Sequence, residues 1–458
     1  MTDAILPVAV IGAGFSGTMA ALHLLPRLGT RTILLCERGE CFGRGVAYAT
    51  TDSWHLLNVR ATNMSAFPDQ PRHFLDWLDA HAATHADDIH TTPAGTFVSR
   101  RLYGDYLASL LTSAVSGREG ASRLILVPDE VVDLVPEPGG YRLVLAGGVT
   151  HRIAGAVLAA GNLMPESAGS GRHVADPWAV PFTEGLQDGT PVVIVGTGLT
   201  MVDLALRLRH AGFGGPVVAL SRRGLRPQPH AAAPPWPMPS FSEPERRSPA
   251  LLLRRLRREI ESAADQGVPW QSVVDSLRPI TSEIWQGIPL DLQDSFLRHA
   301  RPWWDVHRHR MSPPVSAALD TMTATGFLTI RAGHIVDIAE ESEAVLVRFR
   351  PRGTGEIKTI AAQRVIEASG SVAPDRCGMP LLQRLTERKL VRLDRHRLGL
   401  DQSDDLSLIG VSGEKTPGLW GLGPLGTGAF WECVAVPDIR MQAVRVADGI
   451  ARGLDAHP

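Results

Sequence analysis

The feature that most constrains the fold is a glycine motif near the start of the chain. An apolar run, Val8–Ile11, leads directly into residues 12–17, which read G-x-G-x-x-G, and helix-forming residues follow. A strand, a tight glycine turn and a helix are the context in which this motif binds a dinucleotide. Gly12 permits a sharp turn, Gly14 leaves room for a pyrophosphate, and Gly17 lets the helix pack closely on the strand. The stretch predicts a nucleotide-binding α/β unit rather than a chance glycine turn.

An acidic residue stands where such a unit needs one. A second apolar run, residues 32–36, ends at Glu37, which lies 20 residues after Gly17. A carboxylate at this place accepts hydrogen bonds from the ribose diol of a bound dinucleotide. The free N–H groups at the start of the helix favour phosphate. Ser16 and Arg38 flank these groups, so we include both among the expected cofactor-binding residues.

The same arrangement returns in the middle of the chain. An apolar strand enters Gly196-x-Gly198, although Met201 replaces the third glycine of the motif. The next strand ends at Arg222 and Arg223, where the first unit carries its acid. Two arginines suit a 2′-phosphate, because the guanidinium fork matches its geometry, and this favours NADPH over NADH. The alternative interpretation is a solvated strand end in an arginine-rich chain.

Composition excludes several other classes. The net charge is −2 over 458 residues, which gives no sign of a nucleic-acid partner or an anionic membrane surface. No apolar run reaches the length of a membrane span. Four cysteines form neither a disulfide framework nor a metal-ligand pattern, and no Ser-His-Asp pattern with a nucleophile elbow is present. The nucleotide strand begins too early to leave room for a signal peptide, so we expect a cytoplasmic protein whose oligomeric state is left open.

The two glycine units, each followed later by a strand ending in small residues and glycine, resemble the two-dinucleotide-binding flavoproteins. More narrowly, five stretches look like a bacterial family of FAD/NAD(P)-binding proteins that is distantly similar to N-hydroxylating flavin monooxygenases. The resemblance spans nearly the whole chain, and its motifs are specific for cofactors but much less so for the substrate. The five stretches are Gly43–Tyr48, His55–Val59, Tyr103–Tyr106, Trp304–Arg310 and Phe430–Glu432.

The resemblance implies an α/β fold with two Rossmann-like dinucleotide-binding domains, in which an NAD(P)H domain and a helical insert interrupt the FAD domain. Residues 1–170 would form the first part of the FAD domain, and residues 365–458 would return to complete it. Residues 171–364 would form the NAD(P)H domain, with the helical insert at about 225–320. We also expect a final helix that begins near Trp431.

The resemblance also implies which residues hold each cofactor. Residues of the first glycine unit would hold the ADP part of FAD, and Val131 would meet its adenine. A second group would lie toward the flavin, and the middle unit would hold NADPH. Gly423 is followed by proline rather than by the aspartate of disulfide reductases, so the ribitol contact must come from elsewhere. The implied cofactor-binding residues are Gly12, Gly14, Ser16, Gly17, Glu37, Arg38, Gly43, Gly45, Asn58, Val131, Gly161, Gly196, Gly198, Thr200, Arg222, Arg223, Gly370, Gly423, Trp431 and Glu432.

Two further clusters allow more than one interpretation. Cys36 and Cys41 have the spacing of a redox dithiol, but Cys36 precedes Glu37 and belongs to the strand, which favours a buried hydrophobe. His307 and His309 could suggest a metal, but they would diverge on a helix and lack a third ligand, so we expect no metal site. Interdomain packing and substrate anchoring are the remaining interpretations of this second cluster.

These features together predict an FAD enzyme that takes hydride from NADPH. Without a dithiol, electrons must pass to oxygen or to a diffusible acceptor. We expect a monooxygenase that acts on a small-molecule substrate with oxygen, with N-hydroxylation as one open form of the reaction, and we name His307, Trp304 and Asn58 as candidate catalytic residues. The alternatives are an NAD(P)H dehydrogenase that reduces a quinone or another acceptor, and a non-catalytic flavin-binding sensor.

Overall fold

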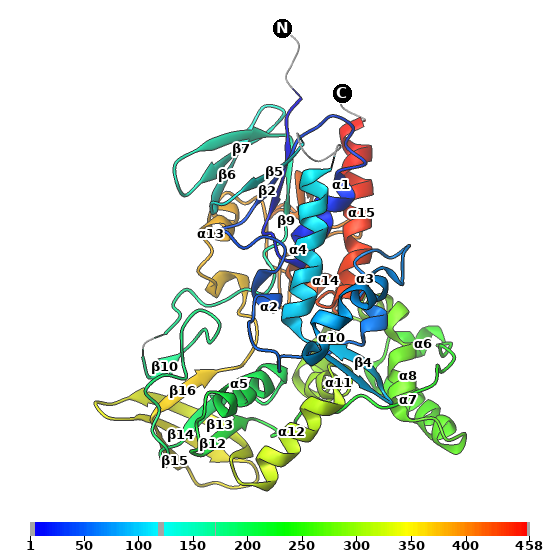
Figure 1. The fold of residues 1–458 in the computed structure, drawn as a ribbon. Coiled ribbons are helices and arrows are strands. Elements are labelled where there is room, and N and C mark those ends of the chain that lie inside the picture. Colours follow the sequence, from blue (N-terminus) through cyan, green and yellow to red (C-terminus); the bar gives the residue numbers. More distant parts are fainter. Residues whose placement is uncertain (1–4, 118–122, 170, 456–458) are drawn as a thin grey trace.

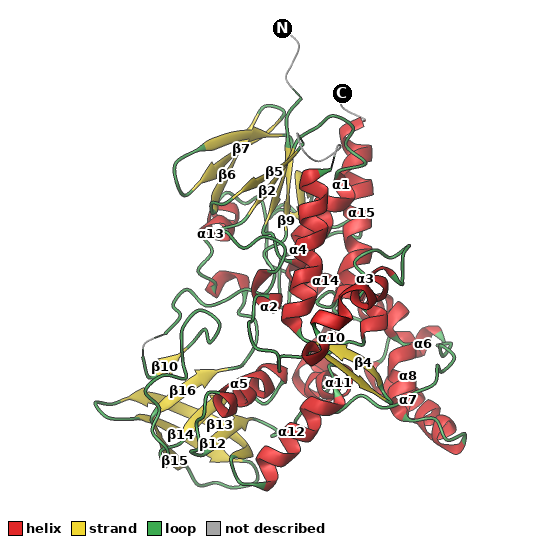
Figure 2. Ribbon diagram, viewed as in Figure 1, coloured by secondary structure: helices red, strands yellow, loops and turns green. Residues whose placement is uncertain are grey.

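The computed structural model describes residues 5–117, 123–169 and 171–455. Two separate, mainly parallel sheets organise this part of the chain. In Figure 1 the first sheet occupies the upper unit, which contains both ends of the chain, and the second lies at the lower left. Figure 2 shows the helices of a further segment gathered at the lower right. The expected α/β class with two nucleotide-binding folds is confirmed.

The first sheet places β1 (Val8–Ile11) in the middle of its parallel strands. Val8 and Val10 pack into one hydrophobic core, while Ala9 and Ile11 pack into another. Side chains alternate along a strand, so a fully apolar run is buried only when both faces of the sheet are covered. The order is β17-β18-β9-β1-β2-β5, in which the other strands are β2 (Ile33–Cys36), β5 (Leu124–Val127), β9 (Gly155–Leu158), β17 (Ser407–Ile409) and β18 (Lys415–Gly421).

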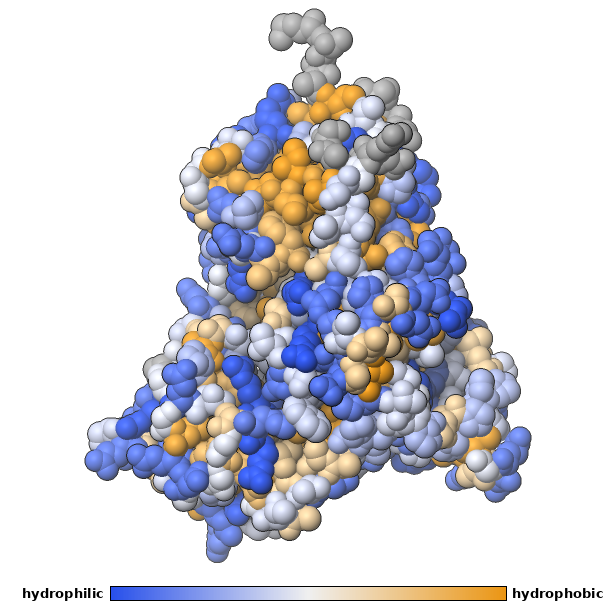
Figure 3. Space-filling view, viewed as in Figure 1, coloured by the Kyte–Doolittle hydropathy of each residue, from blue (hydrophilic) through white to orange (hydrophobic). Residues whose placement is uncertain are grey.

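Different layers cover the two faces of this sheet. The helices α1 (Phe15–Leu24), α4 (Arg100–Ser116) and α15 (Val436–Asp455) run side by side on one face (Figure 1). A small antiparallel sheet and α13 (Pro380–Glu387) cover the other face. Apolar surface gathers over the edge strand β5 in Figure 3, where Ile125 is 47% exposed. The strands of the small sheet are β6 (Val131–Glu137), β7 (Gly140–Leu145) and β8 (Thr150–Ile153).

In the second sheet, β11 (Val192–Val195) is the middle one of the five parallel strands and enters the second glycine turn. The long strand β13 (Leu328–Glu340) pairs with β12 through its first residues and with β14 through its later ones. A register shift between Ile335 and Asp337 interrupts the pairing with β14. The order is β10-β16-β11-β12-β13-β14-β15, with β10 (His173–Val174), β12 (Val217–Ser221), β14 (Val345–Pro351), β15 (Lys358–Ala362) and β16 (Arg364–Glu367).

Two helices pack on the second sheet, and one of them shortens the expected insert. Val192 and Ile194 share a core with side chains of α5 (Leu199–His210) and α12 (Pro313–Ala324). α12 therefore belongs to the second fold, whereas the sequence places the insert up to about residue 320. Strand β16 pairs with β11, so this fold also extends past residue 364.

The insert between β12 and α12 folds into helices that lie against the first unit. The Trp285 ring stacks on Trp431 at 4.8 Å between centroids, and its Nε1 donates to the carbonyl of Gly428 at 2.8 Å. Residues 428–431 follow the last strand of the first sheet. The insert therefore packs against the first unit, and not only against the second fold from which it extends. Its helices are α6 (Glu243–Arg246), α7 (Pro249–Asp265), α8 (Trp270–Ser276), α9 (Thr281–Gly287), α10 (Leu290–His299) and α11 (Arg301–Arg308).

A buried ion pair joins the two nucleotide folds directly. Arg100 at the start of α4 contacts Asp203 of α5, with 2.9 Å between Nη1 and Oδ2. The His55 ring lies 3.3 Å from the carbonyl oxygen of the same aspartate. The short elements near this junction and the last sheet strand are α2 (Gly45–Tyr48), α3 (His73–His81), β3 (Ile89–Thr92), β4 (Gly95–Val98) and α14 (Thr427–Phe430).

Helix length and polarity bear on membrane association. In the described ranges we find no helix with the length and apolar character needed to cross a bilayer.

The first glycine turn allows a test of the fold. A Cβ on Gly17 would overlap the carbonyl oxygen of Gly12, so the helix must move away from the strand in Gly17→Ala. We expect its free energy of unfolding, measured in urea, to fall by about 3 kcal/mol or more. Gly198→Ala is the control, because a Cβ there meets nothing within 4 Å. Equal stability of the two variants would contradict this packing.

Candidate functional site

The first glycine turn is held in place by backbone contacts. Gly12 adopts φ +97° and donates its N–H to the carbonyl of Cys36 at 2.8 Å. A Cβ at this position would lie 2.5 Å from the carbonyl oxygen of Ala159, at the end of β9. Only glycine combines this φ with such a close approach. The turn therefore rises directly from three neighbouring strands.

The second glycine turn has the same construction. Gly196 adopts φ +117° and donates to the carbonyl of Leu220 at 2.8 Å, and its Cβ would lie 2.5 Å from the carbonyl oxygen of Ala368. Gly161 and Gly370 follow β9 and β16 with φ +68° and +97°, and a Cβ on either would meet open space. The two folds thus repeat one design, with a glycine turn beside a glycine that ends the neighbouring strand.

The helices after both turns begin without a side-chain cap. Gly14 and Gly198 are the N-cap residues of α1 and α5, and neither helix receives a capping hydrogen bond from a side chain. The first N–H groups of a helix lack partners within the helix, and anions bind to them well. Thr200 lies half-buried in the first turn of α5. Both helix starts therefore fit a cofactor phosphate.

Glu37 faces the first turn. Its Oε2 accepts a hydrogen bond from the N–H of Ala13 at 2.7 Å, and its Oε1 accepts one from the N–H of Arg38 at 3.0 Å. Glu37 is half-buried, whereas the Arg38 side chain is exposed. The acid is therefore fixed at the carboxyl end of β2, where the ribose of a bound dinucleotide is expected.

Three glycines from distant segments meet the first turn. Gly43 donates to the carbonyl of Ala13 at 2.8 Å, and a Cβ on Gly45 would lie 2.9 Å from the Cα of Gly14. Gly423 adopts φ +75°, and its Cβ would lie 2.6 Å from the Oγ of Ser16. The structure thus brings together these expected cofactor residues.

Val131 and the arginine pair take different positions. Val131 begins β6 and packs in the same core as Ile11 and Cys36. Arg222 is exposed just after β12, whereas Arg223 donates to the carbonyl of His299 in the insert at 3.2 Å. Arg223 is thus tied to the insert while Arg222 stays exposed, so the two arginines are not equivalent.

The expected helix start at Trp431 is wrong. Trp431 adopts φ +60° after α14, and the final helix begins at Val436. Pro437 in its first turn lacks an N–H group and suits only the beginning of a helix. Trp431 instead stacks on Trp285, while Glu432 lies between the insert and the first unit.

The candidate catalytic residues separate into two places. Trp304 donates its indole N–H to Glu432 Oε1 at 3.1 Å. Asn58 accepts a hydrogen bond through its backbone carbonyl from His230 Nε2 at 2.8 Å. The His307 ring lies 2.7 Å from the carbonyl of Trp303 in its own helix and packs edge-on against a tryptophan of α8. Trp304 and Asn58 therefore border the space between the units, whereas His307 lies among insert residues.

The described cysteines and histidines form neither a redox dithiol nor a metal site. Burial raises the pKa of the Cys36 thiol to about 12, and Cys41 lies exposed in the following loop. A thiol of such high pKa is inert toward disulfide exchange at neutral pH. Across the described ranges, no group of three or more His, Cys, Asp or Glu side chains is placed to hold a metal ion.

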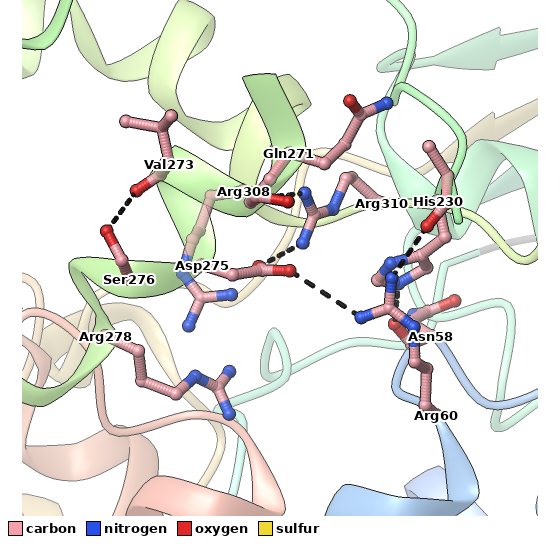
Figure 4. A network of polar contacts seen from close by, with 12 residues as sticks. Asn58, Arg60, His230, Gln271, Val273, Asp275, Ser276, Arg278, Arg308 and Arg310 are labelled. Atoms are coloured by element: carbon pink, nitrogen blue, oxygen red, sulfur yellow. Dashed lines mark hydrogen bonds and ion pairs between the residues drawn. The ribbon is translucent and has the colours of Figure 1, made fainter. Parts of the chain in front are cut away.

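A polar network missed by sequence reasoning lies beside Asn58 and Glu432 (Figure 4). It contains arginines from the first unit and from the insert, around Asp275 of α8. Their positions are far apart in the sequence, and arginine supplies nearly all of the 46 basic residues, so no local signal could single them out. The arginines are Arg60, Arg278, Arg308 and Arg310.

His230 in this network predicts a pH dependence of stability. Burial, and secondarily the charge of Arg310, lowers its pKa to about 3. Between about pH 6.5 and 3 the unfolded chain binds a proton at this histidine that the folded chain does not. The free energy of unfolding therefore decreases as the pH is lowered through this window. We expect urea unfolding of His230→Gln to show a shallower loss of stability than the wild type between these values.

His334→Gln is the control for this pH test, because His334 is exposed on β13. It should lose stability as steeply as the wild type. An equally steep loss in His230→Gln would show that the histidine does not stay neutral in the folded protein.

Comparisons with known proteins agree with this geometry. Residues 9–163 match the family model described as FAD-NAD(P)-binding. No curated protein matches the chain in sequence. Among solved structures, the chain is similar to ornithine N-hydroxylase from Kutzneria sp. 744, with 14% identity, a TM-score of 0.63, and coverage of 98% of this chain and 99% of the other.

Two further solved structures share the fold. L-lysine 6-monooxygenase from Pseudomonas syringae has 15% identity and a TM-score of 0.65, over 98% of this chain and 100% of the other. Thioredoxin reductase from Lactococcus lactis has 11% identity and a TM-score of 0.52, over 98% and 99%. The chain thus contains an FAD/NAD(P)-binding domain and has the fold of the two-dinucleotide-binding flavoproteins.

Proposed function

We propose that the chain is an FAD-dependent NAD(P)H oxidoreductase, and more narrowly a monooxygenase that uses oxygen on a small-molecule substrate. The observation that carries the proposal is the repeated glycine turn, with an uncapped helix and an open glycine in each fold. Two such turns suit two dinucleotides in one chain. FAD, when bound, accepts hydride from NAD(P)H and passes electrons onward.

The first fold suits FAD because more segments of the chain approach its glycine turn than in the second fold. Gly43 and Gly45 approach its turn from one segment and Gly423 from another, which gives a long cofactor more backbone to follow. The second fold is the proposed NADPH domain. Its exposed Arg222 stands where a 2′-phosphate is expected.

The monooxygenase function rests on what the insert encloses. The Trp304–Glu432 hydrogen bond and the stacking of Trp285 on Trp431 close the insert over the segment proposed to face the flavin. Exclusion of water from such a site favours oxygen chemistry over release of peroxide. The buried Cys36 offers no dithiol route. The fold shared with ornithine and lysine hydroxylases supports the same proposal.

The proposed NADPH site predicts unequal roles for its two arginines. Loss of a charge-assisted hydrogen bond costs about 1.5–3 kcal/mol, so Arg222→Ala should weaken NADPH binding by roughly tenfold or more. Arg223→Ala should weaken it less, because Arg223 already donates to His299. Affinities measured by titration with NADPH and NADH check this. The NADH affinity is the internal control, and an equal loss for both nucleotides would mean that Arg222 supports the fold instead.

The reaction itself is tested with the purified, FAD-loaded protein. NADPH added without oxygen should bleach the visible flavin spectrum. Oxygen should then restore the colour and consume NADPH in a way that a quinone does not accelerate. Absence of bleaching would leave a non-catalytic flavin protein. Rapid quinone reduction with slow reaction toward oxygen would replace the monooxygenase with a dehydrogenase.

A further inference from the structure

Four arginine side chains converge where the insert meets the first unit (Figure 4). Arg60 stands just before the short helix at Ala61–Asn63, beside Asn58. Arg278 follows α8, Arg308 ends α11, and Arg310 comes directly after it. Like charges gathered away from water repel one another, so such a group must be neutralised. Whether neighbouring carboxylates neutralise the four arginines completely decides whether the group can also bind an anion.

Two of the arginines are well paired. The Asp275 carboxylate forms an ion pair with Arg310 through Oδ1 and lies 3.6 Å from Arg60 Nη1 through Oδ2. Arg60 also donates to the carbonyls of Ala94 and Ala231. Arg310 is almost completely buried, and it donates to the carbonyl of Gln271. This half of the cluster is held by Asp275 and backbone carbonyls, and only Nε of Arg310 has no partner among its described neighbours.

The other two arginines are paired less completely. Glu432 Oε2 lies 2.9 Å from Arg308 Nη2, but in the described structure neither Nη2 nor Nε of Arg308 has a hydrogen-bond partner. The Arg308 side chain is only 6% exposed. The nearest carboxylate oxygen to Arg278, from Asp438, is 3.7 Å from its Nη2. Buried N–H groups without a well-placed acceptor are costly, so the Arg308 guanidinium can take a further acceptor.

The charges do not balance either. Within the described residues, four guanidinium groups face three carboxylates, those of Asp275, Glu432 and Asp438. Positive charge is therefore in excess, and Arg440 near Asp438 adds to it. The Arg278 side chain is 24% exposed, so an anion from solution can reach the unpaired side of the cluster.

The cluster also lies between residues proposed to face the flavin. His230 connects the Arg60 end to the backbone of Asn58, and Arg308 contacts Glu432. Both Asn58 and Glu432 belong to the proposed flavin site. A molecule held by Arg278 and Arg308 would therefore be held next to the proposed reaction centre.

We propose that Arg278 and Arg308 bind the carboxylate of a small anionic substrate, with Asp275, Arg60 and Arg310 as positioning residues. Arginine binds a carboxylate through paired hydrogen bonds, and a carboxylate supplies negative charge that the cluster lacks. The inference rests on the proposed function and adds the substrate class to it.

The test uses the FAD-loaded full chain and simple probes. Acetate, succinate and glutamate are titrated against it, with inorganic phosphate as the second anion and succinamide as the neutral analogue. The readouts are the shift of the visible flavin spectrum and the Tm. We expect at least one of the three acids to shift both in a saturable way and to bind more tightly than phosphate or succinamide. If none of the acids exceeds succinamide, the proposal is overturned; if phosphate binds best, the site is for a phosphate instead.

Variants distinguish acid binding at the arginine cluster from a general effect of positive charge. Arg278→Gln keeps a half-buried polar side chain and should weaken acid binding by about tenfold or more. Arg308→Lys keeps the charge but loses the fork, and should also weaken binding. Arg298→Gln is the matched control, because this exposed arginine lies in the same insert, on α10. Acid binding unchanged in both cluster variants would overturn the proposal.

Reduction by NADPH without oxygen is measured on the same samples, with no acid added. If the acids bind but NADPH does not bleach the flavin, the oxidoreductase proposal fails and the anion site stands. If NADPH bleaches the flavin but the acids do not bind, the anion site fails and the oxidoreductase proposal stands.

Discussion

The structure depends on one close contact between a glycine and a strand carbonyl, which occurs in both nucleotide folds. Gly12 and Gly196 each bring their Cα against the carbonyl of a neighbouring strand, at Ala159 and Ala368. No residue with a side chain fits there, because a Cβ would lie 2.5 Å from that oxygen in both folds. The contact fixes the direction in which α1 and α5 leave their sheets. The uncapped starts of both helices, and so both proposed phosphate sites, follow from it.

The insert converts two separate nucleotide folds into one candidate site. By itself the first fold offers glycines and an acid, which suit a cofactor but leave nothing to hold a substrate. The insert adds Trp304 and Trp285, which contact the segment at residues 428–432, and it adds three of the four clustered arginines. In the proposed function, the nucleotide folds hold the cofactors and the insert selects the substrate.

Local patterns predicted the fold well, whereas the arginine cluster could not be predicted. The glycine turns depend on residues within a few positions of one another, so their spacing is visible in the sequence. Arg60, Asp275 and Arg308 meet only after both units have folded, and arginine is too common here for any one of them to stand out. The predicted start of the last helix was wrong because Trp431 has a positive φ, which is rare for a side chain of this size. Packing of Trp431 against Trp285 sets this backbone conformation.

The order of strands in the first sheet has a consequence for synthesis of the protein. The middle of that sheet comes from the first 158 residues, but β18, β17 and the covering helix α15 come from residues 407–455. The second sheet is complete at Glu367. Domains fold as units while the chain emerges from the ribosome. The unit in the middle of the chain can therefore fold first, while the opening strands wait, without an edge partner, for the last part of the chain.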